Sequence, residues 1–150
     1  QRNGGLEKDF TTGAISTDPI NHQKMVDTRQ EKIDYISNMI PELAVEGDKD
    51  ADLLVVGWGA THGHLMTAVN ALNKQGKKVA LAHFNYINPL PKNTEQVIKS
   101  YKKVVVCELN SGQFATYLRS KVPGEYLQYN KVQGQPFTVT ELEEYFTGLL

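Results

Sequence analysis

LLVVG at residues 53–57, VALAHF at residues 79–84 and VVVCEL at residues 104–109 are three short, continuous apolar runs. Amphipathic segments of about ten to fifteen residues separate them, which is the rhythm of βαβ units. Strands that are apolar along their whole length need cover on both faces, and right-handed crossovers place helices there. The sequence therefore predicts a three-layer α/β/α domain with a mostly parallel sheet.

Helical patterns with marked ends join these strands. One helix is expected to end before Gly76, and a second is capped by Asn93. A third helix is predicted over about 112–121, followed by a weaker strand over 126–130. The capping box at 138–141 starts a last helix whose apolar stripe faces the sheet.

The first 50 residues differ from the rest of the chain in their acidic composition, because they carry six basic and ten acidic side chains. Asp18 followed by Pro19 has the form of a helix N-cap with proline at the first helical position, so a helix is predicted from about Pro19 to about Met39. Its expected apolar face comprises Val26, Ile33, Ile36 and Ile40. The polar stretch 45–50 indicates a linker. Residues 1–50 are thus predicted to form an arm with one long helix and a linker, and residues 51–150 an α/β domain.

Charge and cysteine content exclude several classes of protein. A net charge of −1 supplies no overall field for nucleic acid or an anionic membrane. Cys107 is the only cysteine, so this chain alone can hold neither a disulfide nor an iron–sulfur cluster. No apolar run approaches the roughly 20 residues that cross a bilayer, which favours a cytoplasmic protein. The polar opening at 1–13 begins with Gln, which suggests that the sequence starts inside a longer polypeptide.

The stretch from Gly57 to Gly63, GWGATHG, follows a strand and opens a helix, where free backbone N–H groups favour an anion. Its spacing is one residue longer than G-x-G-x-x-G, and the second strand ends without a carboxylate for a ribose, so dinucleotide binding is disfavoured. The glycines serve either a tight strand-to-helix turn or a contact with an anion or a partner chain.

The histidines do not indicate a metal site. His62 and His64 point about 200° apart on a helix and would not share an ion easily. His62 is either a hydrogen-bonding group at a cleft or a helix-start histidine with a solvent or backbone partner. His83, late in an apolar strand, is expected to be a satisfied core or cleft-edge side chain and not a general base.

The segment from Cys107 to Gln113 offers no nucleophile. Ser111 follows a strand, but Leu109 and Gln113 stand where G-x-S-x-G requires glycine, so Asn110 or Ser111 is expected to cap a helix. Cys107 is predicted to be a buried, inert thiol. Glu108 is the one carboxylate expected near a cleft. No catalytic residue is assigned.

The stretch KVQGQPF at 131–137 is the least generic part of the sequence. One interpretation is a loop whose glutamines satisfy backbone groups while Phe137 acts as a hydrophobic staple. The other is a surface presented to another subunit, formed by Trp58, Gln133, Gln135 and Phe137.

Several motifs taken together resemble the C-terminal part of the alpha subunit of 2-oxoacid:ferredoxin oxidoreductases, especially the 2-oxoglutarate type. They are GGLEKD at 4–9, DPINHQKMVDTR at 18–29, LLVVGWGATHG at 53–63, NPLPKN at 88–93, VCELNSGQ at 106–113 and NKVQGQPFT at 130–138. The match runs along nearly the whole chain. It departs at 60–62, where Ala-Thr-His stands and family members often carry Ser-Thr-Tyr or similar.

The resemblance implies a domain similar to the transketolase C-terminal domain, over residues 51–150, appended to a thiamine-pyrimidine domain. Such complexes decarboxylate a 2-oxoacid on thiamine diphosphate with magnesium, reduce ferredoxin through iron–sulfur clusters and yield an acyl-coenzyme A. The expected partners are the remaining alpha-subunit domain, the beta subunit and, through the holoenzyme, ferredoxin. This chain is expected to bind no cofactor itself, since it lacks the Gly-Asp-Gly diphosphate motif and cluster ligands.

The resemblance also implies that the Leu53 strand lies between the Val79 and Val104 strands. Loops 57–63 and 110–113 would then border one crevice at the switch point of the sheet. Its candidate residues are Gly59, Thr61, His62, Gly63, Asn110 and Ser111. We expect this domain to shape a cleft and to support assembly. The alternative is a small anion- or effector-binding module that uses the Gly57–Gly63 turn.

Overall fold

The computed structural model describes residues 4–150, so the first three residues of the polar opening lie outside the described part. The chain divides into two compact units. One contains the residues up to Ile40 together with Asn88–Leu90, and the other contains 41–87 and 91–150. The division falls after Ile40, whereas the sequence placed it after Asp50.

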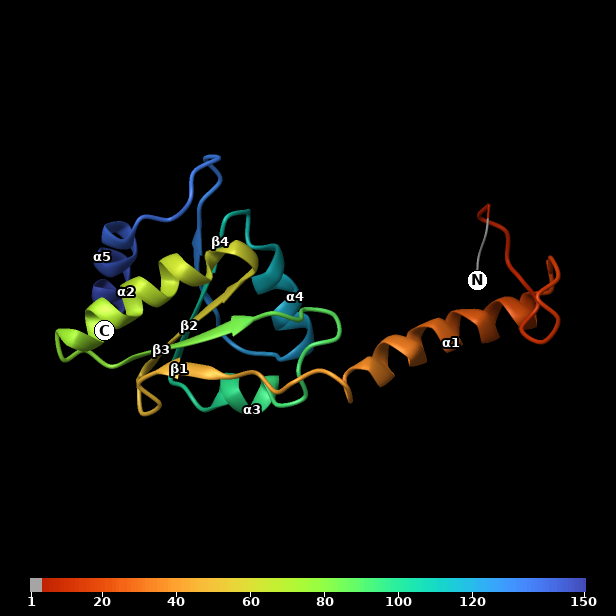
Figure 1. The fold of residues 1–150 in the computed structure, drawn as a ribbon, viewed down its shortest axis with the longest axis horizontal. Coiled ribbons are helices and arrows are strands. Elements are labelled where there is room, and N and C mark those ends of the chain that lie inside the picture. The colour runs from red at the N-terminus through yellow and green to blue at the C-terminus, as the bar shows by residue number, and fades with distance from the viewer. Residues whose placement is uncertain (1–3) are drawn as a thin grey trace. The chain divides into compact units, whose positions relative to one another are not determined.

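The larger unit is built on one five-stranded sheet (Figure 1). Its strands are β1 (Val45–Gly47), β2 (Leu53–Trp58), β3 (Val79–Phe84), β4 (Lys103–Glu108) and β5 (Leu127–Asn130), in the order β1-β3-β2-β4-β5. All neighbouring pairs are parallel except β1 and β3. The expectation that the Leu53 strand lies between the Val79 and Val104 strands is confirmed.

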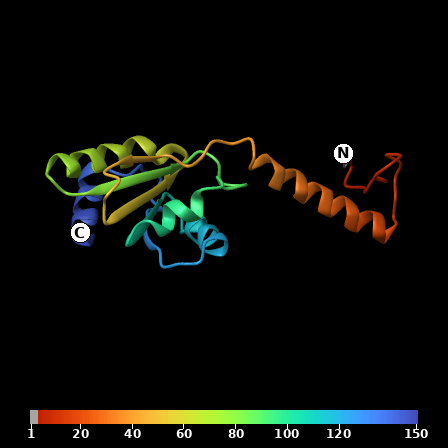
Figure 2. The ribbon, with the colours of Figure 1, turned by 90° about the horizontal axis from the view of Figure 1, so that it is seen from below.

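Helices cover both faces of this sheet. They are the 3-10 turn η1 (Gly59–Thr61) and the helices α2 (His62–Lys74), α3 (Thr94–Lys99), α4 (Gln113–Lys121) and α5 (Val139–Leu149). α2 lies on one side of the sheet and α3 and α4 on the other (Figure 2), while α5 packs beside α2. The predicted three-layer α/β/α class with a mostly parallel sheet is confirmed.

The core under α2 and α5 is apolar and fully enclosed. Side chains from β2, α2 and α5 form it, among them Leu53, Leu65, Leu142 and Phe146, each 0% exposed. Burying each such side chain stabilises the fold by roughly 1.5–3 kcal/mol. Phe137, expected on a partner surface, is only 1% exposed and belongs to this core. That expectation is wrong, because the residue before the Thr138 N-cap packs inward and the staple interpretation holds.

The predicted linker is also partly wrong. Val45–Gly47 form β1, an edge strand in which Val45 pairs with Ala82 and Gly47 with Ala80 of β3. The polar composition of this stretch suggested a linker. An edge strand, however, also keeps polar side chains, and the strand with which it pairs lies far away in the sequence.

The smaller unit consists of a loop and the helix α1 (Pro19–Ile36). The predicted start is confirmed, since the Asp18 carboxylate accepts a hydrogen bond from the Asn21 amide at 2.7 Å. The helix ends three residues before Met39, and a tight turn follows. Among residues 4–150, α1 contributes no buried side chain, so its predicted apolar face forms no enclosed core.

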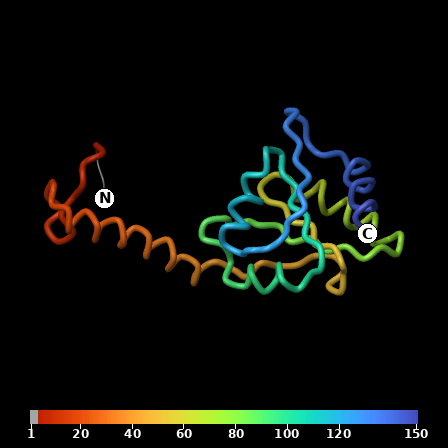
Figure 3. Tube along the Cα trace, turned by 180° about the vertical axis from the view of Figure 1, so that it is seen from behind, coloured from red at the N-terminus to blue at the C-terminus, as the bar shows by residue number. Residues whose placement is uncertain are grey.

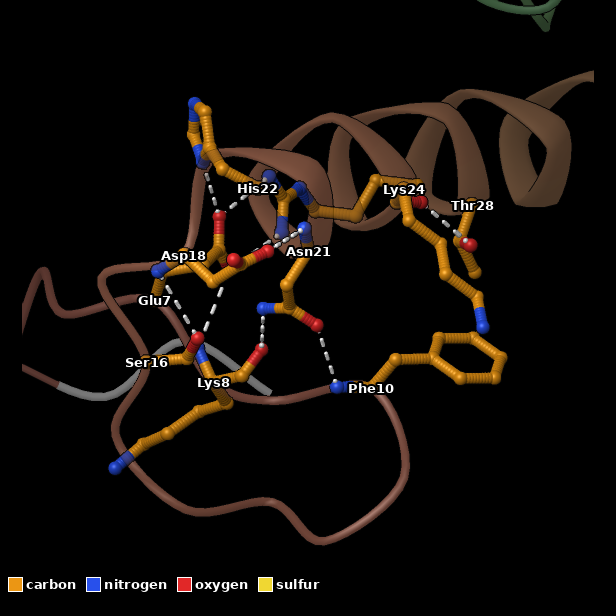
Figure 4. A network of polar contacts seen from close by, with 10 residues as sticks. Glu7, Lys8, Phe10, Ser16, Asp18, Asn21, His22, Lys24 and Thr28 are labelled. Carbon is orange, nitrogen blue, oxygen red and sulfur yellow. Dashed lines mark hydrogen bonds and ion pairs between the residues drawn. The ribbon is translucent and has the colours of Figure 1, made fainter.

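Polar contacts attach the loop to α1 (Figure 4). The Glu7 carboxylate lies 2.7 Å from His22 Nδ1 and accepts hydrogen bonds from both terminal nitrogens of Arg29, at 3.2 and 3.3 Å. Asn21 accepts from the Phe10 amide and donates to the Lys8 carbonyl, both at 2.9 Å. The two motifs GGLEKD and DPINHQKMVDTR are therefore joined in space.

Glu7 makes the attachment of this loop dependent on pH. Hydrogen bonds from Arg29 and then His22 lower the pKa of its carboxyl from 4.5 to about 2. A lowered carboxyl pKa stabilises the attached state above pH 4.5, and this contribution is lost as the pH falls toward 2. Glu7→Gln should therefore reduce hydrogen-exchange protection of the Phe10 amide at pH 7, and the difference from wild type should close near pH 2. Glu31→Gln, which removes an exposed charge from α1, should leave the protection of the Phe10 amide unchanged. A difference of equal size at pH 7 and pH 2 would contradict the assignment.

Candidate functional site

The carboxyl edge of the sheet begins with the tight turn between β2 and α2. A Cβ on Gly57 would lie 2.2 Å from Leu65 Cδ1 and 2.9 Å from Thr61 Oγ1, so only glycine allows the helix to approach the strand this closely. Gly59 has a φ of +62°, which favours glycine. Thr61 is buried and donates to the Trp58 carbonyl at 2.8 Å. The tight-turn interpretation is confirmed for these residues.

Two histidines and a glutamate meet beside this turn. His62 Nε2 lies 2.8 Å from Glu46 Oε1, and the rings of His62 and His83 lie edge to face with centroids 4.8 Å apart. His83 Nε2 is 3.1 Å from the Gly59 carbonyl, which assigns the proton to that nitrogen. Burial, and then the nearby His62, lower the pKa of His83. His83 therefore lies at the edge of a cleft, as the sequence indicated, but it is not fully satisfied as expected, because its buried Nδ1 has no hydrogen-bond partner among the described residues.

This cluster opens into a pocket of about 590 Å³. Its lining combines two carboxylates, the two histidines and several apolar side chains: Pro41, Glu42, Leu43, Ala44, Glu46, Gly59, His62, His83, Asn85, Tyr86 and Pro91. None of these described lining residues is Lys or Arg. Glu42 and Glu46 would repel an anion, so the pocket lends no support to the alternative of an anion-binding module at the Gly57–Gly63 turn.

Asn110 and Ser111 do not line this pocket, so the single crevice bordered by both loops stays a prediction. Asn110 Oδ1 accepts from the Gly112 and Gln113 amides at 2.8 and 3.0 Å, which fixes the turn into α4, and Ser111 is exposed. The aromatic rings of Trp58 and Phe114 pack 6.1 Å apart at this end of the sheet. Gly63 is exposed on α2, and its carbonyl accepts from Thr67.

Glu108 ties three elements together from the end of β4. Its side chain is 0% exposed and accepts hydrogen bonds from the Phe114 amide at 2.8 Å, the Ala115 amide at 2.9 Å and Trp58 Nε1 at 3.3 Å. These amides belong to the first turn of α4, where the helix dipole favours a negative charge. The expectation of a cleft carboxylate is wrong, because Glu108 is fully buried and its oxygens are taken up by these internal donors.

The loop between β5 and α5 stands out from the body of the domain (Figure 3). Lys131 Nζ donates to the Pro136 carbonyl at 2.9 Å and to both Glu141 oxygens at 2.8 and 3.0 Å. Lys131 also lowers the pKa of Glu141. The Thr138 hydroxyl accepts from the Glu141 amide and donates to the Glu141 carboxylate, so the predicted N-cap is present. Gln133 and Gln135 are exposed at the tip. The contacts of Lys131 thus hold the base of the loop, and its tip exposes the two uncharged glutamine side chains.

The sequence did not reveal the partner of His62. Glu46 is 16 residues away, in the stretch taken for a linker, and only the pairing of β1 with β3 brings it to this edge. No local spacing pattern signals such a contact.

Within residues 4–150 no group of three or more His, Cys, Asp or Glu side chains has the arrangement of a metal site. Cys107 is fully buried, and burial raises the pKa of its thiol.

Comparisons with known proteins agree with one another. The model of pyruvate:ferredoxin oxidoreductase core domain II matches residues 51–142. The chain is 41% identical to 2-oxoglutarate oxidoreductase subunit KorA of Mycobacterium tuberculosis over 99% of its own length and 23% of that protein. It is 30% identical to the alpha subunit of 2-oxoacid:ferredoxin oxidoreductase 1 of Aeropyrum pernix, over 88% of its length and 22% of that protein. The chain thus spans about a quarter of the length of these relatives.

Solved structures extend this similarity. A 2-oxoglutarate:ferredoxin oxidoreductase from Magnetococcus marinus, with 2-oxoglutarate, coenzyme A and succinyl-CoA bound, matches with a TM-score of 0.86 and 28% identity, over 96% of this chain and 26% of that chain. A split-gene transketolase matches with a TM-score of 0.54 and 12% identity, over 73% of this chain and 42% of that one, and so shares the fold. No helix within residues 4–150 has both the length and the apolar character to cross a membrane.

Replacement of Glu108 by Gln should destabilise the larger unit. The amide keeps one acceptor oxygen and turns an NH₂ group toward backbone donors, which leaves a buried N–H without a partner at a cost of about 1–3 kcal/mol. Trp58 fluorescence during urea unfolding reports this change, because the indole contacts the substituted side chain. Glu144→Gln, an exposed charge on α5, serves as the matched control. Equal stability of both variants would refute a structural role for Glu108.

Gly57→Ala should cost about 1–3 kcal/mol, because the new methyl group overpacks the contact with Leu65. Gly63→Ala is the control within the same motif, since a Cβ there meets nothing within 4 Å and its stability should stay within about 0.5 kcal/mol of wild type or improve. Thermal unfolding of the two variants distinguishes a packing requirement from a general requirement for glycine in this turn.

Proposed function

We propose a function on the premise that the chain belongs to the pyruvate:ferredoxin oxidoreductase core domain II family. It serves as the C-terminal domain of the alpha subunit of a cytoplasmic 2-oxoacid:ferredoxin oxidoreductase of the 2-oxoglutarate type. The observation that carries this proposal is the 41% identity to subunit KorA, which extends through 99% of the chain and so includes the arm as well as the sheet. The whole enzyme would oxidatively decarboxylate 2-oxoglutarate or a similar 2-oxoacid to an acyl-coenzyme A and reduce ferredoxin.

The described residues do not fit the cofactors of such an enzyme. An iron–sulfur cluster needs several thiolates, whereas the one cysteine, Cys107, is fully buried in the sheet. Magnesium diphosphate needs converging oxygen ligands, and residues 4–150 contain no such group of carboxylates. We therefore assign thiamine diphosphate, magnesium and the clusters to the remaining alpha-subunit domain and the beta subunit.

The contribution of this domain is to support assembly and shape the cleft. Gln133 and Gln135 are exposed, and the contacts of Lys131 with Pro136 and Glu141 hold the loop that carries them. Neutral amides can pair with another subunit's backbone at lower desolvation cost than ionised side chains. The half-buried Trp58, fixed by Glu108, offers an aromatic anchor of the kind found in interface hot spots. We assign Trp58, Gln133 and Gln135 to the partner surface.

Reconstitution tests the proposed function directly. The chain is mixed with the missing pyrimidine-binding domain and the beta subunit, and complex formation is measured together with 2-oxoglutarate-dependent reduction of ferredoxin. We expect a complex and turnover only when all parts are present. Full turnover without this chain would overturn the proposal.

Within that complex, the double substitution of Gln133 and Gln135 by Ala should weaken assembly about tenfold, which corresponds to about 1.4 kcal/mol. The melting temperature of the chain itself should stay unchanged, because neither side chain packs in the core. Gln96→Ala, an exposed amide on α3, is the control. Sedimentation of the complex measures the effect, and unaltered assembly would remove both glutamines from the interface.

A further inference from the structure

Four lysines gather at the amino-terminal edge of the sheet, opposite to the edge described above. The sequences QGKKVAL at 75–81 and SYKKVVV at 100–106 each place two lysines at the start of an apolar strand. Because β3 and β4 run parallel on either side of β2, their amino ends lie at one edge. Leu53 pairs with Val79 on one side and with Lys103 on the other.

This edge contains a pocket of about 460 Å³, a size typical of sites for small ligands. It is lined by Asp52, Leu53, Lys77, Lys78, Lys102, Lys103, Leu149 and Leu150. Four positive side chains and one negative side chain therefore face one concave surface, although the whole chain has a net charge of −1. The excess of positive charge is local and concentrated.

Most of this charge is not neutralised within the described part of the chain. Lys102 pairs with Asp52 at 2.7 Å, both side chains being exposed. Lys77 Nζ donates to Thr147 Oγ1 at 2.6 Å, and Lys103 Nζ donates to the Leu149 carbonyl. These two acceptors are neutral, so they hold the ammonium groups in place without cancelling their charge. The Lys78 side chain makes neither an ion pair nor a hydrogen bond within residues 4–150, but its charge acts on Asp52: Lys102 first, and then Lys103 and Lys78, lower the pKa of this carboxyl.

An ammonium group carries three N–H donors, so Lys77 and Lys103 each keep donors for a ligand beyond the bond that positions them. A phosphate group offers several anionic oxygens at once and is a common partner of lysine. A flat surface for an acidic protein would spread the charges, whereas here they converge on a pocket with an apolar floor of Leu53 and Leu149. We propose that this pocket binds a phosphate-bearing small molecule through Lys77, Lys78 and Lys103. The proposal does not depend on the proposed function.

Calorimetric titration of the chain with sodium pyrophosphate tests this site. Wild type should bind with an affinity that falls as sodium chloride is added. Lys78→Gln should weaken binding at least about fivefold, and the double variant Lys78→Gln/Lys103→Gln at least about tenfold. Lys32→Gln removes the same charge from the exposed surface of α1 and should leave the affinity unchanged.

The variant Asp52→Asn should change the affinity for pyrophosphate in the opposite direction. Removing the one acidic side chain of the pocket should tighten pyrophosphate binding, an effect that a damaged fold cannot imitate. A parallel titration with ADP shows whether the site accepts a diphosphate carried by a larger molecule or only the free anion, and either result supports it. Absence of pyrophosphate binding, equal weakening by Lys32→Gln, or binding of polyglutamate in place of pyrophosphate would overturn the proposal.

Discussion

The pairing of β2 with β3 on one side and β4 on the other is the constraint on which the larger unit depends. Leu53 to Val56 are 0% exposed, so this strand is enclosed on both faces as well as along both edges. An unpaired backbone group in such a position would cost as much as a lost hydrogen bond, and hence the register is strongly specified. Once it is set, all amino ends of the parallel strands lie at one edge and all carboxyl ends at the other, and the chemistry of the two edges follows.

At the carboxyl edge of the sheet, the buried carboxylate of Glu108 joins neighbouring elements of the larger unit. Burying the Glu108 carboxylate is costly in isolation, but three N–H donors and the first turn of α4 offset that cost. Glu108 thereby orients Trp58 and closes the space between the ends of β2 and β4. The result is a rigid edge, which suits a domain that positions surfaces for other parts of an enzyme.

Patterns local in sequence predicted most of this fold, and contacts distant in sequence account for what they missed. The apolar runs, the Asp18 and Thr138 caps and the buried Cys107 each have a signal within a few residues. The order of the strands came from the family resemblance and not from periodicity. Strand β1 and its Glu46 were missed because the partner strand β3 lies more than 30 residues along the chain. Phe137 was misplaced because a proline-phenylalanine pair before a cap suits both a staple and an interface.

The demands of the fold explain some distinctive residues and leave others unexplained. Gly57 is required by the approach of α2, and Glu108 by unpaired amides. Lys78 has no such structural role, because its side chain is exposed, makes neither a hydrogen bond nor an ion pair within residues 4–150, and acts on Asp52 only through its charge. A charged side chain without a structural role, placed beside three other lysines on one pocket, is the kind of feature that binding explains, and it lies at the edge opposite to the histidine cluster.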